Sequence, residues 1–381
     1  MSETMYLVQV TLIGGLVSWL LRHDALFVRL QVSIWTFGVA AIGWRFGLDD
    51  QVGFYSNDQA FYSGTVQSFS TAGIPWGVDA WLGKKIPYTV AALPLALAGI
   101  HPTLALKTVS LVCLLVLTRS VLDISESRTY KDEVTTLWLT ACGLIGTFFS
   151  LLALRETMMM LFVYRFTNSK SLATRGVSLI ALYLLRPHLA AAVFVAEVVM
   201  AGWRLVRARL NLGAAESPSL IVVGVILGTT LFSLGAMGLS NLRTPFSGGW
   251  GIPQAIRVAS NFVGLQFLTV PEETVNYSLT RLLLLRLVLN ETIVIPVAFT
   301  VVCLFCYRTL NDRARFTLLA FTIYSSVVIG TDFNSFRQNI PFMPLMGLVV
   351  LGVIRSRSAA SSSTADDPDL AHSPRVTPRG M

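Results

Sequence analysis

Charge is scarce in this sequence. Of its 381 residues only 13% are Asp, Glu, Lys or Arg, whereas 54% are hydrophobic. Soluble domains carry about a quarter charged residues, and a globule of this size with so little charge could not cover its surface with polar groups. The composition therefore excludes an ordinary soluble domain and predicts an integral membrane protein.

Cysteines are also few, and they form no recognisable framework. Cys303-x-x-Cys306 has the spacing of a redox or metal motif, but it lies in an apolar run and no second pair of ligands accompanies it. We interpret the cysteines as packing residues and infer no disulfide framework from them. The four are Cys113, Cys142, Cys303 and Cys306.

Long apolar runs dominate what is present. Each is close to the length of a membrane crossing, although several are short or broken by charge. The sequence therefore predicts an all-α, polytopic membrane helix bundle over residues 1–355, with about nine to twelve transmembrane helices and a cavity open to the outer side. The runs are 5–21, 25–44, 86–100, 103–122, 134–154, 157–166, 176–203, 220–239, 282–306, 316–329 and 340–354.

The positive charges predict an orientation. The formal net charge is +8, but Lys and Arg form short clusters between apolar runs, which is typical of membrane topology and not of nucleic-acid binding. The clusters at 204–209, 308–315 and 355–357 are expected to be cytoplasmic. The long polar interval 45–85 then forms a structured outer loop, and 356–381 a disordered cytoplasmic tail. Between residues 86 and 176 the pattern does not fix the parity of the crossings.

A small set of ionisable residues lies inside the apolar runs, where a charge costs several kcal/mol and usually serves a function. The set comprises the pair Arg155-Glu156, the triplet Arg186-Pro187-His188, Glu197 about two and a half turns beyond His188 on the same apolar run and, at the mouth of the last helix, Arg337. Proline interrupts helical hydrogen bonding, which lipid tolerates only beside a polar partner or a water-filled cavity. The competing interpretation is that these arginines mark helix ends and extend to the lipid headgroups.

Several arginines in one site indicate an anionic substrate, because guanidinium groups match phosphate in a bidentate fork that is always charged. In a membrane the natural candidate is a phosphate or diphosphate attached to a lipid. A soluble anion that is carried across the membrane is the alternative.

The outer loop adds acidic and aromatic residues. Asp49, Asp50 and Asp58 could act as a general base or bind a divalent cation such as Mg²⁺ or Mn²⁺. Asp58 and Tyr62 are one helical turn apart and share a face if this segment is helical. The loop aromatics could stack on sugar rings, but aromatic residues are also expected at any membrane interface.

These motifs resemble two groups of membrane enzymes. Asp58-x-x-x-Tyr62 in the first large outer loop, and Arg337 followed by Pro341 at the start of a late helix, resemble the GT-C glycosyltransferases that use polyprenyl-phosphate donors. Arg155 at the start of a helix, with Arg-Pro-His at 186–188, is similar to polysaccharide polymerases of the Wzy and EpsG type. The resemblance implies transfer of a sugar or glycan from a polyprenyl phosphate or diphosphate carrier in cell-surface polysaccharide assembly at the plasma membrane.

The resemblance also implies roles for residues. Asp58, or else Asp49 or Asp50, would be the general base, and His188 would relay a proton or stabilise the kink. The residues expected to bind the carrier are Arg155, Glu156, Arg186, Arg337 and Tyr62. A divalent cation is possible, other glycan-assembly proteins are possible partners, and nucleic acid is not expected. A lipid-linked glycan flippase, an anion transporter and a non-catalytic scaffold stay open as alternatives.

Overall fold

The computed structural model describes residues 56–122, 146, 149–150, 152–210, 220–233, 295–306, 310–329 and 339–365. Throughout these segments the only regular elements are helices. Two of them, α6 (Pro102–Leu122) and α11 (Pro187–Leu210), are long and apolar enough to cross a membrane. The predicted runs 5–21 and 25–44 lie outside the described residues, as does most of the run 134–154.

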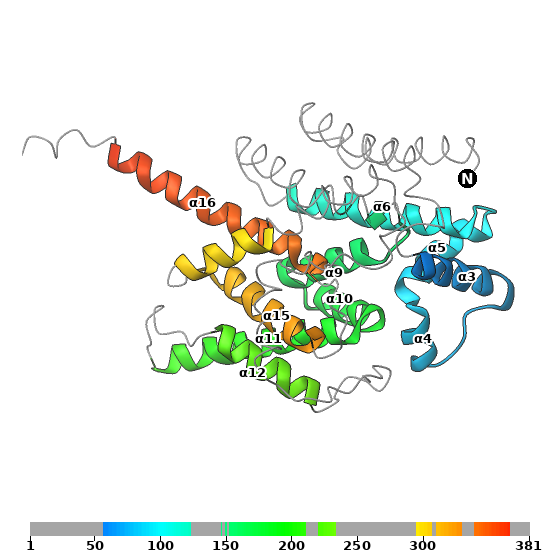
Figure 1. Ribbon diagram of the computed structural model, residues 1–381, viewed down its shortest axis with the longest axis horizontal. Helices are drawn as coiled ribbons and strands as arrows, with labels where there is room; N and C mark the ends of the chain where they lie inside the picture. The colour runs from blue at the N-terminus through cyan, green and yellow to red at the C-terminus, as the bar shows by residue number, and fades with distance from the viewer. Residues whose placement is uncertain are drawn as a thin grey trace, which may run out of the picture.

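Of the remaining described helices, all but α3 and α4 overlap predicted apolar runs. In Figure 1, α6 and α12 lie on opposite sides of a middle group formed by α9, α10, α11 and α15. Cys113, Cys303 and Cys306 are buried free thiols, in agreement with a packing role. The helices are α3 (Ser56–Ala72), α4 (Val78–Lys84), α5 (Ile86–Leu97), α9 (Glu156–Asn168), α10 (Leu172–Leu185), α12 (Leu220–Ser233), a helix over Ile295–Phe305, α15 (Asp312–Ile329), the 3-10 turn η7 (Ile340–Phe342) and α16 (Met343–Ala365).

Two helices lie in the described part of the predicted outer loop. Asp58 lies in the first turn of α3, where a carboxylate interacts favourably with the helix dipole. The segment 45–85 was predicted to be structured, and its described part is helical over α3 and α4. Asp58 and Tyr62 therefore do share one helix, one turn apart.

The apolar run predicted over 176–203 is two helices with a break at Arg186. Proline disfavours helical geometry in the residue before it, and Arg186 is accordingly extended, with φ −159° and ψ 93°. α10 therefore ends at Leu185, and α11 begins at Pro187, where the missing N–H costs no hydrogen bond.

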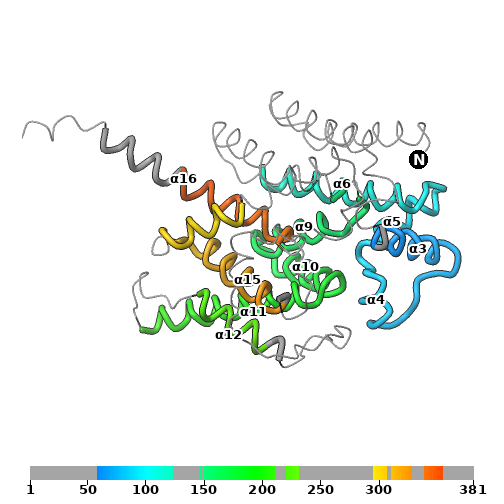
Figure 2. Tube along the Cα trace, viewed as in Figure 1, coloured from blue at the N-terminus to red at the C-terminus, as the bar shows by residue number. Residues whose placement is uncertain are grey.

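The helices α9, α10, α11 and α15 form an antiparallel group, called the helix group below. Different residues lie at its two ends. At one end Arg186, which precedes α11, meets Tyr324 of α15. At the other end Phe166 of α9 stacks on Phe316 of α15, with ring centroids 6.3 Å apart, and Arg175 of α10 lies over the Phe166 ring. Eleven residues of α-helix separate Arg155 from Phe166, which amounts to about 16 Å at 1.5 Å per residue. Figure 2 traces the chain segments that meet in this group.

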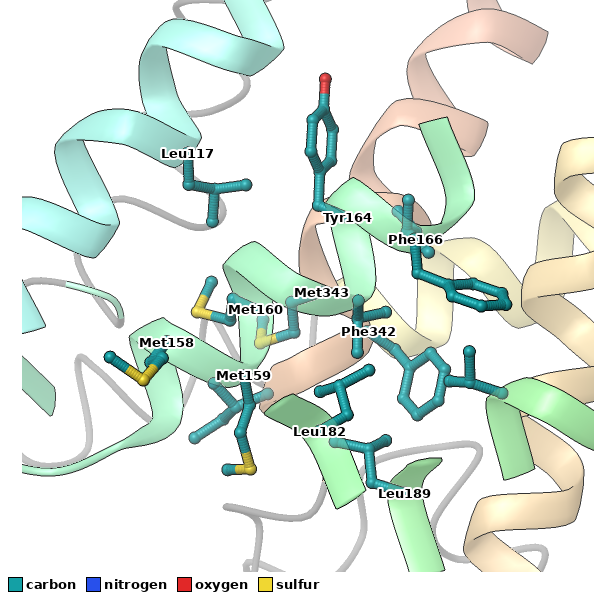
Figure 3. Packing of buried hydrophobic residues seen from close by; sticks show 14 of the residues in the cluster. Leu117, Met158, Met159, Met160, Tyr164, Phe166, Leu182, Leu189, Phe342 and Met343 are labelled. Carbon is teal, nitrogen blue, oxygen red and sulfur yellow. The ribbon is translucent and has the colours of Figure 1, made fainter. Parts of the chain in front are cut away.

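The core between these helices is apolar and rich in methionine. Met158, Met159 and Met160 of α9 are all buried. Figure 3 shows Phe342 and Met343 packed in the same buried cluster as these methionines and Leu182. Methionine fills irregular spaces well, which suits a position where four helices and a 3-10 turn converge.

Two glycines bring α12 against α15 at close range. A methyl group added to Gly228 would lie 2.5 Å from the Cβ of Ser326 and 2.7 Å from the backbone oxygen of Ile323. Added to Gly224, it would lie 2.7 Å from the Cβ of Thr322. The spacing Gly224-x-x-x-Gly228 is the small-residue pattern by which membrane helices approach each other closely.

Replacement of Gly228 by alanine should destabilise the protein. The added methyl group meets backbone, which cannot rotate away, so the expected cost is about 1–3 kcal/mol. Thermal unfolding of the detergent-purified chain measures it as a lower Tm. Gly202→Ala on α11 is the matched control, because a methyl group there meets nothing within 4 Å. An unchanged Tm in Gly228→Ala would show that α12 does not pack against α15 as described.

α16 extends beyond the expected end of the membrane domain. The helix runs to Ala365, past the predicted start of the tail at 356, and projects from the bundle in Figure 1. The Ala- and Ser-containing stretch after Arg357 has no helix breaker until Pro368, which disfavours helix in the residue before it. The rest of the predicted tail, 366–381, lies outside the described residues.

Candidate functional site

Arg186 occupies the break between α10 and α11. Its side chain is buried, with 8% of its surface exposed. Its Nη1 donates a hydrogen bond of 2.7 Å to the Tyr324 hydroxyl, which comes from α15. The proline that ends α10 thus turns a cationic side chain into the protein interior.

Arg155 reaches the same place from the start of α9. Arg155 is the N-cap of that helix. Two residues before it, Ala153 has a left-handed backbone with φ 52°, which is unfavourable for a residue with a Cβ. The Arg155 Nη1 donates a 2.9 Å hydrogen bond to the backbone oxygen of Leu185, the residue before Arg186. The Arg155 guanidinium also lies over the Tyr62 ring, 5.9 Å from its centroid. Two arginines predicted as substrate ligands therefore meet at one helix break.

Lys85 is a third cation near this break, and its place at the end of the predicted loop 45–85 gave no sign of a role in the site. It is half-buried and joins α4 to α5 in a left-handed conformation, with φ 54° and ψ 52°. The pKa of Lys85 is lowered from 10.5 to about 7, mainly by burial and additionally by the positive charges of Arg155 and Arg186.

His188 and Glu156 lie near the same helix break. The His188 ring stacks on Tyr324, with centroids 5.5 Å apart and planes 12° from parallel. The charges of Arg186, Arg155 and Lys85 all act on His188. Glu156 is fully buried beside Arg155 in sequence, and its charge acts on both Tyr88 and Tyr324.

Two tyrosines and a serine hold the start of α9, and with it Arg155, in position. The Tyr62 ring packs edge-on against Tyr88 at 5.4 Å. The Tyr88 hydroxyl is 2.8 Å from the Ser110 hydroxyl, and Ser110 donates a 2.9 Å hydrogen bond to the backbone oxygen of Leu154. Since Leu154 precedes Arg155, these contacts fix the start of α9 against α5 and α6.

We call Lys85, Arg155 and Arg186 the cationic cluster. Each of the three lies where one helix ends or another begins, and the three come from separate parts of the chain. Asp58 is half-buried on α3, one helical turn before Tyr62. The predicted general base therefore lies one turn from the residue whose ring contacts Arg155.

Three predicted site residues cannot be placed. Arg337, Asp49 and Asp50 lie outside the described residues. Asp49 and Asp50 were also the predicted ligands of a divalent cation. Within the described segments, no three His, Cys, Asp or Glu side chains gather in a way that could hold a metal ion.

Glu197, which the sequence placed on the apolar run after His188, belongs to the other end of the helix group. It forms salt bridges with Arg175 at 3.0 Å and with Arg204 at 3.2 Å. Along α11 it is about 14 Å from His188. Glu197 therefore joins α10 to α11 and does not belong to the cationic cluster.

The cationic cluster can bind an anion. Two arginines fixed by hydrogen bonds offer several N–H donors in defined directions, and a lysine adds a mobile charge. Their partial burial strengthens the interaction with a charged ligand, because water screens it less. No known protein family, curated protein or solved structure matches the chain.

Proposed function

We propose that the chain is a polytopic membrane glycosyltransferase that takes a sugar or glycan from a polyprenyl phosphate or diphosphate carrier. The single observation that carries the proposal is the meeting of Arg155 and Arg186 at a helix break inside an apolar helix group. Charge at such a position is costly unless it binds something. A lipid-linked phosphate supplies a negative charge for the arginines and a hydrocarbon tail that can lie against apolar helices and lipid.

Support for membrane insertion comes from α11. This helix contains an apolar stretch long enough to cross a membrane, yet only 33% of that stretch is buried in the protein. Large apolar side chains are exposed on α10, α11 and α12, which water would disfavour and lipid would accept. They include Leu172, Ile180, Phe194, Val198 and Ile226.

An orientation follows from α11. Arg186 precedes this helix of 24 residues, and Arg207 and Arg209 lie in its last turn, about 32–35 Å away along the axis. Positive charges accumulate on the cytoplasmic side of plasma-membrane proteins. The proposal therefore puts the cationic cluster toward the outer side, beside α3 and α4 of the predicted outer loop, and the C-terminus in the cytoplasm.

In the proposed reaction an acceptor hydroxyl attacks the anomeric carbon of the donor sugar. A new carbon–oxygen bond to the acceptor forms as the bond to the carrier phosphate breaks, and the electron pair leaves with the phosphate oxygen. Arg155 and Arg186 stabilise that charge. Asp58 takes the proton of the attacking hydroxyl, as a general base one helical turn from Tyr62. A repeat-unit polymerase would use the same steps with a longer glycan as the transferred group.

The test is deletion of the gene, followed by analysis of surface glycans and lipid-linked intermediates. The proposal expects the carrier to accumulate with its sugar or glycan still attached and the surface glycan to lose a sugar or its length, with recovery when the intact chain is restored. Incubating purified chain with donor and acceptor in detergent then asks whether the glycosidic bond forms. Carrier held at the inner leaflet, with no bond formed in detergent, would instead indicate a flippase.

A further inference from the structure

We propose that the end of the helix group opposite to the cationic cluster binds the headgroup of an anionic phospholipid. Arg175 and Arg204 would contact the lipid phosphate, and the hydrocarbon chains would lie against exposed apolar side chains of α11. This site is separate from the one proposed for glycan transfer. The inference requires that the chain lies in a membrane, but it holds whether or not the chain transfers a glycan.

One carboxylate holds the two arginines side by side. The Oε2 of Glu197 on α11 lies 3.0 Å from Arg175 of α10, and its Oε1 lies 3.2 Å from Arg204. The Arg175 guanidinium also lies over the Phe166 ring, 4.7 Å from its centroid. The Nε of Arg204 donates a 3.3 Å hydrogen bond to the backbone oxygen of Met200. Two guanidinium groups in a defined arrangement therefore share one negative charge, and a net positive charge is left for a ligand.

This arrangement leaves N–H donors available. Arg204 uses its Nε and one Nη in the contacts above, and 52% of its side chain is exposed, so the other Nη can donate outward. The Nε of Arg175 and the indole Nε1 of Trp203 are buried and have no acceptor within the described segments. A buried donor without an acceptor is costly. The phosphate and ester oxygens of a phospholipid are acceptors of the kind that these donors require.

An exposed apolar stripe runs along α11 beside the two arginines. Phe194, Val198 and Leu205 are each more than half exposed, and at 3.6 residues per turn they lie within about 40° of one another around the helix. Glu197 and Arg204 directly precede Val198 and Leu205 in the sequence. The ion pairs therefore follow the edge of the stripe. A lipid can cover the stripe with its hydrocarbon chains while its headgroup contacts the arginines.

The charge at this end favours an anionic lipid. Basic residues greatly outnumber acidic ones at the described ends of α9, α10, α11 and α15 and in the turn between α9 and α10. In the proposed orientation this end meets the cytoplasmic leaflet, which carries the anionic lipids. A zwitterionic headgroup brings an ammonium group into the same positive field and should bind less tightly. The basic residues are Arg165, Lys170, Arg175, Arg204, Arg207, Arg209, Arg313 and Arg315, and the acidic residues are Glu197 and Asp312.

Lipid titration of the detergent-purified full chain, followed by native mass spectrometry, tests this inference. The probes are dioleoyl phosphatidylglycerol and dioleoyl phosphatidylcholine, which differ only in the headgroup. At about 0.15 M salt the Debye length is about 8 Å, so distant exposed charges contribute little. For the intact chain we expect a Kd about tenfold lower for phosphatidylglycerol. Inorganic phosphate should not displace the bound lipid, because it lacks the hydrocarbon chains.

Two variants probe the arginines, and a third is the matched control. Arg204→Gln should raise the Kd for phosphatidylglycerol about tenfold, because it removes a charge-assisted hydrogen bond to the phosphate. Arg175→Lys keeps a cation near the Phe166 ring but loses the guanidinium fork, and should also weaken binding. Arg209→Gln removes the same charge from an exposed position five residues further along α11 and should leave the Kd unchanged. The Tm of Arg204→Gln should stay normal, because an exposed ion pair contributes little stability.

Each of the other results would overturn the inference. Equal weakening by Arg204→Gln and Arg209→Gln would mean a diffuse attraction by net charge and no defined site. Normal binding by folded Arg204→Gln and Arg175→Lys would exclude both arginines as ligands. Equal Kd values for the two lipids would exclude selection of an anionic headgroup, and displacement by inorganic phosphate would exclude a lipid as the ligand. All of these results would leave the proposed transferase function standing, because it depends on the opposite end of the helix group.

Discussion

Replacing Arg186 with alanine is expected to lower glycan transfer about 100- to 1,000-fold, the usual cost of removing a group that stabilises charge in a transition state. The side chain is buried and fixed by the Tyr324 hydroxyl, so no other residue of the described helices can take its place without moving the break before Pro187. Transfer is measured in membranes with a defined donor and acceptor. The amount of folded chain is measured in parallel by size-exclusion chromatography in detergent.

Three companion variants make the result specific. Arg186→Lys keeps the positive charge but loses the planar, bidentate guanidinium, so it should be more active than Arg186→Ala and less active than the intact chain. Tyr324→Phe removes the hydroxyl that orients Arg186 and should cost about tenfold, as expected for a hydrogen bond to a charged group. Arg209→Ala, at the exposed far end of α11, should transfer at the normal rate. Normal transfer by folded Arg186→Ala would remove the cationic cluster from the mechanism.

Asp58→Asn should lower transfer about 100- to 10,000-fold, because an amide cannot accept the proton of the attacking hydroxyl. The amide has nearly the same shape, so α3 and the Tyr62 contact with Arg155 should persist. Binding of the carrier should therefore change little while the rate falls. The measurement is the separate determination of kcat and KM for the lipid-linked donor.

The control for Asp58 is Asp79→Asn. Asp79 is an exposed carboxylate in the first turn of α4, within the same outer segment. Its replacement should leave kcat unchanged. If Asp58→Asn, Asp49→Asn and Asp50→Asn all transfer at the normal rate, no aspartate of this segment is the base.

Local chemistry explains what the sequence could predict. Pro187 dictates the extended backbone of Arg186, so the position of that helix break could be predicted from two adjacent residues. Asp58 and Tyr62 are four residues apart, so the helical period alone predicted that they lie one turn apart if the segment is helical.

Contacts between distant segments explain what the sequence could not predict. Tyr324 lies in an apolar run, and nothing near it in sequence indicates an arginine 138 residues away. Lys85 resembles an ordinary loop lysine until the arginines of two other helix ends are placed beside it. For Glu197 the sequence indicated a site residue and the structure does not place it there. Its salt-bridge partners, Arg175 and Arg204, lie at the end of the helix group opposite to the cationic cluster.

The separation of the cluster residues along the chain has a consequence for biosynthesis. In the proposed membrane setting, Arg155 and Arg186 are synthesised well before Tyr324, so both guanidinium groups would enter the bilayer before the hydroxyl that binds Arg186 is present. Lipid headgroups or the insertion machinery would have to bind those charges until then. Synthesis of α15 would therefore be the step that completes the site.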